Sequence, residues 1–143
     1  MNATQKDISQ LIREVFIYIQ AEDRRLSQQF DLTLLQLWTL IHLEDPAGLS
    51  PGTLARLVLC DKSCMTRLID ELEARELVVR QQGKDRRSLL IALTEQGRMV
   101  RASILSAQKE HLSASTQPLD ETDIQEARSI LGRFLNTLSA TQS

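Results

Sequence analysis

Two short stretches of the sequence gather side chains that donate hydrogen bonds to anions. In the first, Lys62, Ser63, Thr66 and Arg67 fall within the segment DKSCMTRLIDELEAREL. In the second, a turn at residues 83–87 (Gly-Lys-Asp-Arg-Arg) places three cations around one carboxylate. Ammonium and guanidinium groups attract phosphates, and a guanidinium can also donate two parallel hydrogen bonds to a planar partner. The chemistry that these residues offer is recognition of phosphate and of flat polar edges.

The first stretch is expected to be an amphipathic helix that begins after Asp61, a good N-cap residue. Its apolar residues recur at intervals of three, four and seven and predict a buried stripe: Met65, Leu68, Ile69 and Leu72. The polar donors lie in the first two turns on the opposite side. The second stretch joins two predicted strands, residues 77–80 and 88–93, which are rich in Val, Ile and Leu and make a β-hairpin.

The elements that must position these two stretches are predicted to be helical. An apolar stripe marks a helix at residues 6–29, and a Thr33–Gln36 capping-box pattern opens a second one. Ser50-Pro51 begins a short helix, residues 51–58, which a tight turn without the usual glycine joins to the Asp61 helix. After the hairpin, Thr94 caps a long helix, and Asp120 caps a last helix that reaches residue 138.

Two short helices followed by a basic hairpin are typical of a helix-turn-helix with a wing. We expect Lys62, Ser63, Thr66 and Arg67 to face a DNA major groove, where Arg67 can bind guanine with two hydrogen bonds. Lys84, Arg86 and Arg87 are expected to enter a minor groove, with Asp85 paired to Arg87 so that it stiffens the wing. The alternative interpretation is a polar surface with an ordinary surface ion pair.

The net charge of the chain does not indicate a nucleic-acid partner, whereas the distribution of charge along the sequence is consistent with one. The net charge of the 143 residues is −2, but residues 56–101 hold 10 basic and 7 acidic side chains. The length suits a single domain, residues 1–143, within which residues 31–97 would form the DNA-binding lobe. No signal peptide, membrane span or disulfide framework is expected, so the cytoplasm is the expected location.

The arrangement of four motifs is similar to that of the MarR family of bacterial transcriptional regulators. They are TLARL at residues 53–57, TRLIDELE at residues 66–73, DRRS at residues 85–88 and LTEQG at residues 93–97. The resemblance covers about residues 8–138. It implies a mainly α fold with a small β-hairpin wing, a winged helix-turn-helix with additional N- and C-terminal dimerisation helices.

The resemblance further implies a homodimer formed by residues 6–29 and 98–138. It also implies a palindromic DNA operator and, usually, repression relieved by a small molecule or an oxidant. Independently, the apolar stripes of the terminal helices exceed what one small domain can cover, which favours a two-fold dimer. In the family an arginine of the wing enters the minor groove, and the sequence does not decide between Arg86 and Arg87.

The remaining candidates for chemistry have ordinary alternatives. Cys60 and Cys64 lie at the start of the Asp61 helix and could form a redox switch, or could simply pack. If both were helical, their Cβ atoms would be about 5–6 Å apart, too far for a disulfide without local unwinding. Effector-pocket candidates are Arg13, Tyr18, Trp38 and His42, which could equally be core residues. No metal or cofactor is expected.

Two competing functions remain open at this stage. One is a winged-helix module that binds protein instead of DNA, although such a module would be expected to lack the basic wing. The other is a small thiol enzyme, which is disfavoured because the chain has no C-x-x-C motif and no local Cys/His or Ser/His/Asp pairing. The expected partners are therefore double-stranded DNA, a second copy of the chain and a small-molecule effector. No membrane and no enzymatic activity are expected.

Overall fold

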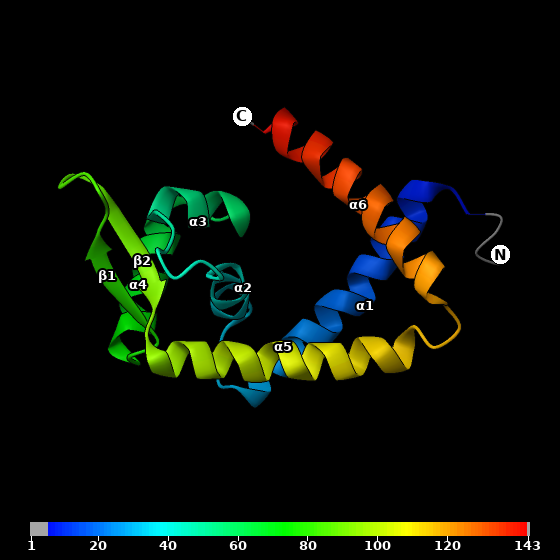
Figure 1. Cartoon of the computed structure of the whole chain (residues 1–143), viewed down its shortest axis with the longest axis horizontal. Helices are drawn as coiled ribbons and strands as arrows, with labels where there is room; N and C mark the ends of the chain where they lie inside the picture. Colours follow the sequence, from blue (N-terminus) through cyan, green and yellow to red (C-terminus); the bar gives the residue numbers. More distant parts are fainter. Residues whose placement is uncertain (1–5, 143) are drawn as a thin grey trace. The chain divides into compact units, whose positions relative to one another are not determined.

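The computed structural model describes residues 6–142, so residues 1–5 and 143 of the predicted single domain lie outside it. The described chain divides into two compact units, one ending at Ala107 and one beginning at Gln108. Its elements follow the order α1 (Ile8–Gln29), α2 (Leu34–His42), α3 (Pro51–Leu57), α4 (Lys62–Ala74), β1 (Val78–Gln82), β2 (Leu89–Leu93), α5 (Glu95–Ser115) and α6 (Glu121–Thr141) (Figure 1). The prediction of a mainly α chain with one β-hairpin is confirmed.

The predicted N-caps begin the helices as expected. The Thr33 hydroxyl accepts the Gln36 N–H, and the Gln36 side chain accepts the Thr33 N–H, which completes the capping box of α2. Ser50 caps α3 ahead of Pro51, and Asp61 caps α4. Because each cap satisfies N–H groups that a helix leaves unpaired, the starting point of α4, and with it the facing of its side chains, is fixed locally.

Three helices end in the same way, and none of them uses glycine. Asp31, Leu59 and Glu76 follow α1, α3 and α4, and each has a positive φ between 53° and 59°. In each case this residue and the next donate their N–H groups back into the last turn, as in Leu59 N–H to Arg56 O and Cys60 N–H to Ala55 O. The tight turn before α4, in which the usual glycine is missing, is therefore made by Leu59, at a cost of about 1–2 kcal/mol.

The core of the first unit lies where α2, α3, α4 and the hairpin meet. On α4, the four residues predicted to be buried are buried: Met65, Leu68, Ile69 and Leu72. Leu37 and Leu40 of α2, Leu54 of α3 and Ile91 of β2 are fully buried in the same cluster. One face of α4 is thereby held against the unit, and its opposite face is left in solvent.

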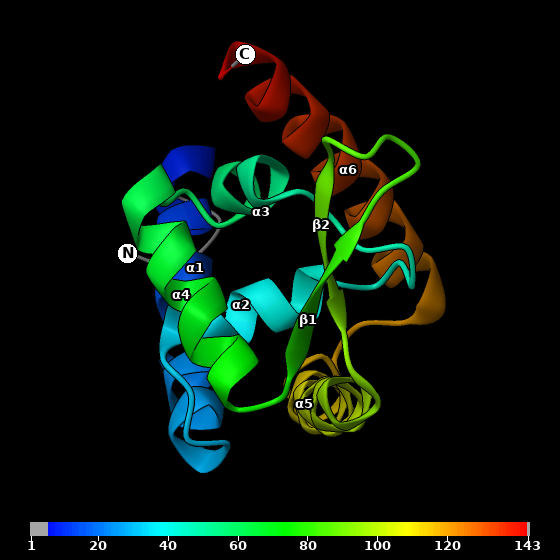
Figure 2. The same cartoon turned by 90° about the vertical axis from the view of Figure 1, so that its left-hand side faces the viewer.

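The hairpin is anchored at its base and free at its tip. β1 and β2 pair antiparallel, with Val78 opposite Leu93 and Gln82 opposite Leu89, so β1 extends two residues beyond its predicted end. Leu49 adds two backbone hydrogen bonds to Ile91, at 2.9 and 2.8 Å, on the other side of β2. Residues 83–87 carry the turn away from α2 and α4 (Figures 1 and 2).

Polar contacts join the helices of the first unit. The Trp38 indole N–H donates to Asp23 Oδ2 at 2.8 Å and ties α2 to α1. The Gln36 amide donates to Glu71 Oε2 at 2.8 Å and ties α2 to α4. Arg75, just after α4, donates to the backbone oxygens of Asp31 and Phe30. The orientation of α4 thus depends on side-chain hydrogen bonds as well as on apolar packing.

The apolar stripes of α1 and α6 are not covered within the described chain. Among the apolar residues of α1, only Leu26 is buried. In α6 no residue is buried, although the stripe has the predicted helical spacing. The exposed apolar residues of this helix include Ile130, Leu131, Phe134, Leu135 and Leu138. A helix with this much exposed apolar surface is uncommon on a monomeric protein and is typical of an interaction site.

Close packing at Gly97 gives a test of this fold. A Cβ added to Gly97 would lie 2.0 Å from the Leu77 carbonyl oxygen, at the point where α5 begins against the base of the hairpin. We expect Gly97→Ala to lower the free energy of unfolding by about 1–3 kcal/mol through overpacking, although alanine favours helices. Urea unfolding followed by circular dichroism measures this.

Gly52→Ala is the matched control, because a Cβ there meets nothing within 4 Å. It should leave the free energy of unfolding unchanged or raise it by up to about 1 kcal/mol. Equal stability of the two alanine variants would contradict the close approach of α5 to Leu77.

Candidate nucleic-acid interface

The front of α4 presents the four predicted donors to solvent. Lys62, Ser63, Thr66 and Arg67 are exposed, on the side opposite the buried stripe. The Thr66 hydroxyl donates to the Lys62 backbone oxygen at 2.9 Å, and the residue remains exposed to solvent. The helix N-terminus adds partial positive charge at the same place. The exposed position predicted for these four residues is therefore the one that the structure has, and their contact with DNA stays a prediction.

The later turns of α4 carry Asp70 and Glu73, and the guanidinium of Arg80 on β1 pairs with both carboxylates. This guanidinium donates to Asp70 Oδ1 at 2.5 Å and to Glu73 Oε1. The hydrogen bond to Asp70, together with the charges of both carboxylates, raises the pKa of Arg80. In the sequence Arg80 counts only as one more cation of the hairpin. The sequence analysis did not predict that Arg80 connects β1 to α4. The carboxylates at positions 70 and 73 were the one indication that a cation would pair with α4.

The wing turn is held by backbone contacts. The Gly83 N–H donates to Ser88 O at 2.9 Å, and the Ser88 N–H donates to Asp85 O at 2.9 Å. The Asp85 carboxylate accepts the Arg87 backbone N–H at 3.2 Å. Within residues 6–142 no ion pair joins Asp85 to Arg87, so the expected side-chain pair is replaced by this backbone contact. Asp85 shapes the turn but does not neutralise the Arg87 guanidinium.

Lys84, Arg86 and Arg87 are all exposed on this turn. In the described part of the chain no carboxylate forms an ion pair with them, nor with Lys62 or Arg67. Because α4 and β1 are neighbours in one compact unit, the five cations belong to the same unit of the chain. Such a surface can hold phosphates at two places at once.

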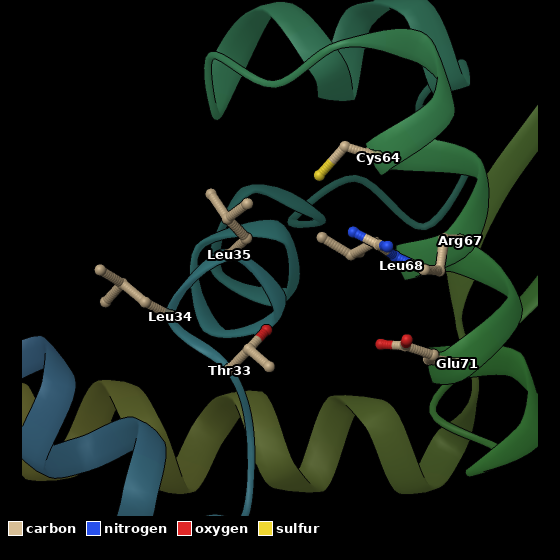
Figure 3. Close-up of a pocket in the computed structure, with 7 residues that line it drawn as sticks. All are labelled: Thr33, Leu34, Leu35, Cys64, Arg67, Leu68 and Glu71. Carbon is tan, nitrogen blue, oxygen red and sulfur yellow. The ribbon is translucent and has the colours of Figure 1, made fainter.

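A groove of about 480 Å³ lies between α2 and the start of α4 (Figure 3). Its walls carry apolar side chains together with a thiol, a guanidinium and a carboxylate. The lining residues are Thr33, Leu34, Leu35, Cys64, Arg67, Leu68 and Glu71. Arg67 thus belongs both to the exposed front of α4 and to the rim of this groove.

The four residues predicted for an effector pocket do not line this groove. The Tyr18 side chain is 79% exposed, and Arg13 is exposed on the same helix. Trp38 is held by its hydrogen bond to Asp23. Partial burial and the nearby charge of Arg101 lower the pKa of His42. Their participation in effector binding stays a prediction.

Cys60 and Cys64 are both free and half-buried. Cys60 precedes α4 instead of lying within it, so the helical spacing assumed from the sequence does not apply to this pair. Burial, followed by a hydrogen bond with the Cys64 thiol, raises the pKa of Cys60 to about 11. Cys60 is therefore a protonated thiol at neutral pH, which disfavours it as the attacking group of a peroxide sensor. The redox switch stays a prediction.

Metal binding and membrane insertion were also considered for the described residues. Within the described residues no group of three or more His, Cys, Asp or Glu side chains could hold a metal ion. Over the same range, no helix is both long enough and apolar enough to cross a membrane.

Comparison with known proteins identifies relatives of this fold. The sequence model of the MarR family matches residues 30–88, which include the capping box of α2, all of α4 and the wing turn. The HTH-type transcriptional regulator SarZ of Staphylococcus aureus (strain USA300) is 33% identical over 78 residues, 54% of this chain and 53% of SarZ. The chain thus spans about half the length of the curated relatives that it matches.

Solved structures match nearly the whole chain. CouR from Rhodococcus jostii RHA1, bound to p-coumaroyl-CoA, is 27% identical with a TM-score of 0.76, covering 92% of this chain and 93% of CouR. A MarR-family regulator from Listeria monocytogenes, complexed with a 26mer DNA, has a TM-score of 0.81 at 18% identity, covering 96% and 92%. The second likeness is one of fold alone. Together they place the helices and the hairpin of this chain in a winged helix-turn-helix arrangement.

The Asp85 contact makes a specific prediction about the wing. Asp85→Asn keeps an oxygen that can accept the Arg87 N–H, whereas Asp85→Ala removes it. We expect hydrogen exchange at the Arg87 amide to be unchanged in the asparagine variant and faster in the alanine variant. Amide exchange followed by NMR measures this. If the Arg87 amide exchanged faster than in the unchanged protein in both variants, and equally fast in the two, the negative charge of Asp85 would matter and its hydrogen-bonding oxygen would not.

Proposed function

The chain belongs to the MarR family of transcriptional regulators, and we propose from this premise that it binds a pseudo-palindromic DNA operator as a homodimer and represses transcription. The family consists of regulators and not of enzymes. One observation carries the DNA-binding part: five exposed cations without carboxylate partners in the described chain stand on two neighbouring elements of one unit. The relative from Listeria monocytogenes was solved with DNA, which supports the same assignment.

The front of α4 is suited to base edges. Arg67 has a guanidinium that can bind guanine O6 and N7 together, and Thr66 offers a methyl group for thymine contact. Lys62 and Ser63 lie at the positively polarised start of the helix and are suited to phosphates. Arg80 supports this role indirectly, because its positive charge offsets part of the negative charge of Asp70 and Glu73, which would otherwise repel the DNA backbone more strongly.

The wing turn is suited to a minor groove. Lys84, Arg86 and Arg87 project on a narrow turn, and cations are attracted by the enhanced negative potential of narrow, A·T-rich grooves. Since Asp85 is engaged by the Arg87 backbone, the guanidinium of Arg87 remains available. Both arginines therefore stay candidates for the residue that enters the groove.

The alternative is a winged-helix module that binds protein. Its interface would be expected to be mostly apolar and its affinity only weakly dependent on salt. A DNA interface releases counterions, so its affinity falls steeply with salt, with a slope of about −0.9 for each phosphate contacted. The clustered cations favour DNA.

The uncovered apolar faces of α1 and α6 support the homodimer. Leu131 and Leu138, seven residues apart on α6, are 58% and 47% exposed, and Ile12, Val15 and Ile19 are exposed on α1. A two-fold dimer would bury these faces and set two DNA-binding lobes at a fixed separation. We propose half-sites about 10 base pairs apart, since successive major grooves are roughly 34 Å apart.

Release by a small molecule completes the proposal. CouR was solved with an acyl-CoA, which shows that a relative of this fold takes such a ligand. In this chain the groove between α2 and α4 includes Arg67 on its rim, so a ligand there would compete with DNA for that guanidinium.

DNA binding is tested with sequences selected from a random pool, followed by affinity measurements over a range of salt. We expect Arg86→Ala/Arg87→Ala to weaken binding to all sequences and to reduce the salt slope by about 2, one unit for each lost phosphate contact. Arg67→Ala should instead cost about 1–3 kcal/mol on selected sites and relax the preference at one base pair.

The matched control removes two positive charges from parts of the surface outside the wing. Arg24→Ala/Lys109→Ala changes two exposed cations on α1 and α5. Its DNA affinity and salt slope should remain those of the unchanged protein. If the wing variant and this control bound DNA equally well, the wing would have no place in the interface.

The dimer is tested by placing charge on one face of α6. Leu131→Asp/Leu138→Asp should dissociate the dimer at micromolar concentration, because two carboxylates would have to be buried. Ser129→Asp/Asn136→Asp adds the same charge on the opposite side of the helix and should remain dimeric. Light scattering coupled to gel filtration gives the masses. A monomeric unchanged protein at micromolar concentration would refute the homodimer.

A further inference from the structure

A line of three polar side chains runs along one side of α3, the helix that precedes α4. The Ser50 hydroxyl donates to Thr53 Oγ1 at 2.9 Å, and Arg56 Nη2 donates to the same oxygen at 3.3 Å. Because these residues follow one another at intervals of three, they lie on the same face of the helix. The line ends in a guanidinium whose direction is set by its contact with Thr53.

Arg56 resembles the five cations of α4 and the wing. Its side chain is exposed, and within residues 6–142 no carboxylate forms an ion pair with it. A guanidinium has five N–H donors, and the contact with Thr53 uses one of them. The backbone of Arg56 is held as well, because its carbonyl oxygen accepts the Leu59 N–H at the end of α3. Arg56 therefore combines a fixed backbone with donors that an anion can use.

The hydroxyls of Ser50 and Thr53 have one proton to spare between them. The Ser50 oxygen accepts the Thr53 backbone N–H at 3.2 Å, and Thr53 Oγ1 accepts from Arg56. The hydrogen bond between the two hydroxyls uses one of their two protons. Among the described residues no acceptor takes the other proton, so it is available beside the guanidinium. The donors are side chains, since the Thr53 N–H is already bound to Ser50.

The position of α3 indicates which anion these donors meet. The helix contacts α4 and also β2, the second strand of the wing (Figure 2). Leu49, just before α3, is joined to Ile91 of β2 by two backbone hydrogen bonds. In a helix-turn-helix the first helix crosses the DNA backbone while the second lies in the major groove. A backbone phosphate is therefore the anion expected next to α3.

We propose that Arg56 and the Ser50–Thr53 hydroxyl pair form a clamp for one DNA phosphate in each half-site. The guanidinium binds one non-bridging oxygen through a charge-assisted hydrogen bond, and the spare hydroxyl proton binds the same phosphate. The inference rests on the proposed binding of DNA and adds α3 to an interface otherwise made by α4 and the wing. A phosphate contact carries no base preference, so the clamp fixes the orientation of the protein on the duplex.

The alternative is that Arg56 only stabilises the short helix α3. Its contact with Thr53 spans a single helical turn, and such contacts on a helix surface contribute little to folding. Loss of the Arg56 side chain therefore leaves the fold intact under both interpretations, and circular dichroism verifies this. The two interpretations differ in the effect on DNA affinity and on its dependence on salt.

Affinity for a duplex selected from a random pool, measured over a range of salt, tests the charge of the clamp. Arg56→Ala should weaken binding about 10-fold or more on selected and unselected sequences alike, and lower the salt slope by about 1. Arg56→Lys keeps the charge and should keep the slope. Arg24→Ala removes an exposed arginine from α1 and should change neither quantity. An Arg56→Ala variant with the affinity and slope of the unchanged protein would overturn the clamp.

Neutral methylphosphonates, placed one at a time in the same duplex, locate the phosphate. One position in each half-site should weaken binding of the unchanged protein and have no further effect on Arg56→Ala, because the partner is already gone. Thr53→Val removes the hydroxyl, keeps the shape and should weaken binding about 5-fold.

If every methylphosphonate weakened Arg56→Ala as much as the unchanged protein, Arg56 would contact no phosphate. An unchanged protein that binds no duplex from the pool would refute the proposed function itself, so the two failures are distinguishable.

Discussion

Burial of one face of α4 is the constraint on which the rest of the first unit depends. Met65, Leu68, Ile69 and Leu72 are removed from water together, and each such side chain contributes about 1.5–3 kcal/mol. Because successive side chains of a helix point in fixed relative directions, that burial also decides which residues face outward. The positions of Lys62, Thr66 and Arg67 are therefore consequences of the packing behind them. The outward residues need no stabilising contacts of their own, and so they are available to a partner.

Electrostatics divides the exposed face of α4 into two halves. The start of the helix carries cations and the positive end of the dipole, whereas the later turns carry Asp70, Glu71 and Glu73. Arg80 reaches across from β1 to two of these carboxylates, and Glu71 accepts a hydrogen bond from Gln36 of α2. These exposed pairs add little stability, about 0–1 kcal/mol each. These pairs instead change the electrostatic potential at the surface of α4, because the carboxylates that would repel an anionic partner already have hydrogen-bonding partners.

Sequence patterns predicted the parts of this structure that local chemistry decides. The N-caps at Thr33, Ser50 and Asp61 and the buried stripe of α4 follow from spacing within a few residues, and the structure has them. Contacts between distant residues could not be derived in this way. Nothing in the spacing of Arg80 distinguishes it from the other hairpin cations, and the Asp85 carboxylate could be assigned to a guanidinium or to a backbone N–H. The proposed effector residues Arg13 and Tyr18 illustrate the same limit, because a helical stripe does not say what covers it.

The start of α4 brings several features together. Its outer side presents Arg67, its flank lines the groove, and its Asp61 cap accepts the N–H of Cys64. A ligand in the groove can change DNA affinity only through a difference between its interactions in the free and DNA-bound states. Under the proposed function that difference is local, since Arg67 lines the groove and is also the proposed contact to a base edge. The proposed competition between a ligand and DNA therefore acts directly on one side chain of α4, and it does not require a rearrangement that spreads through the fold.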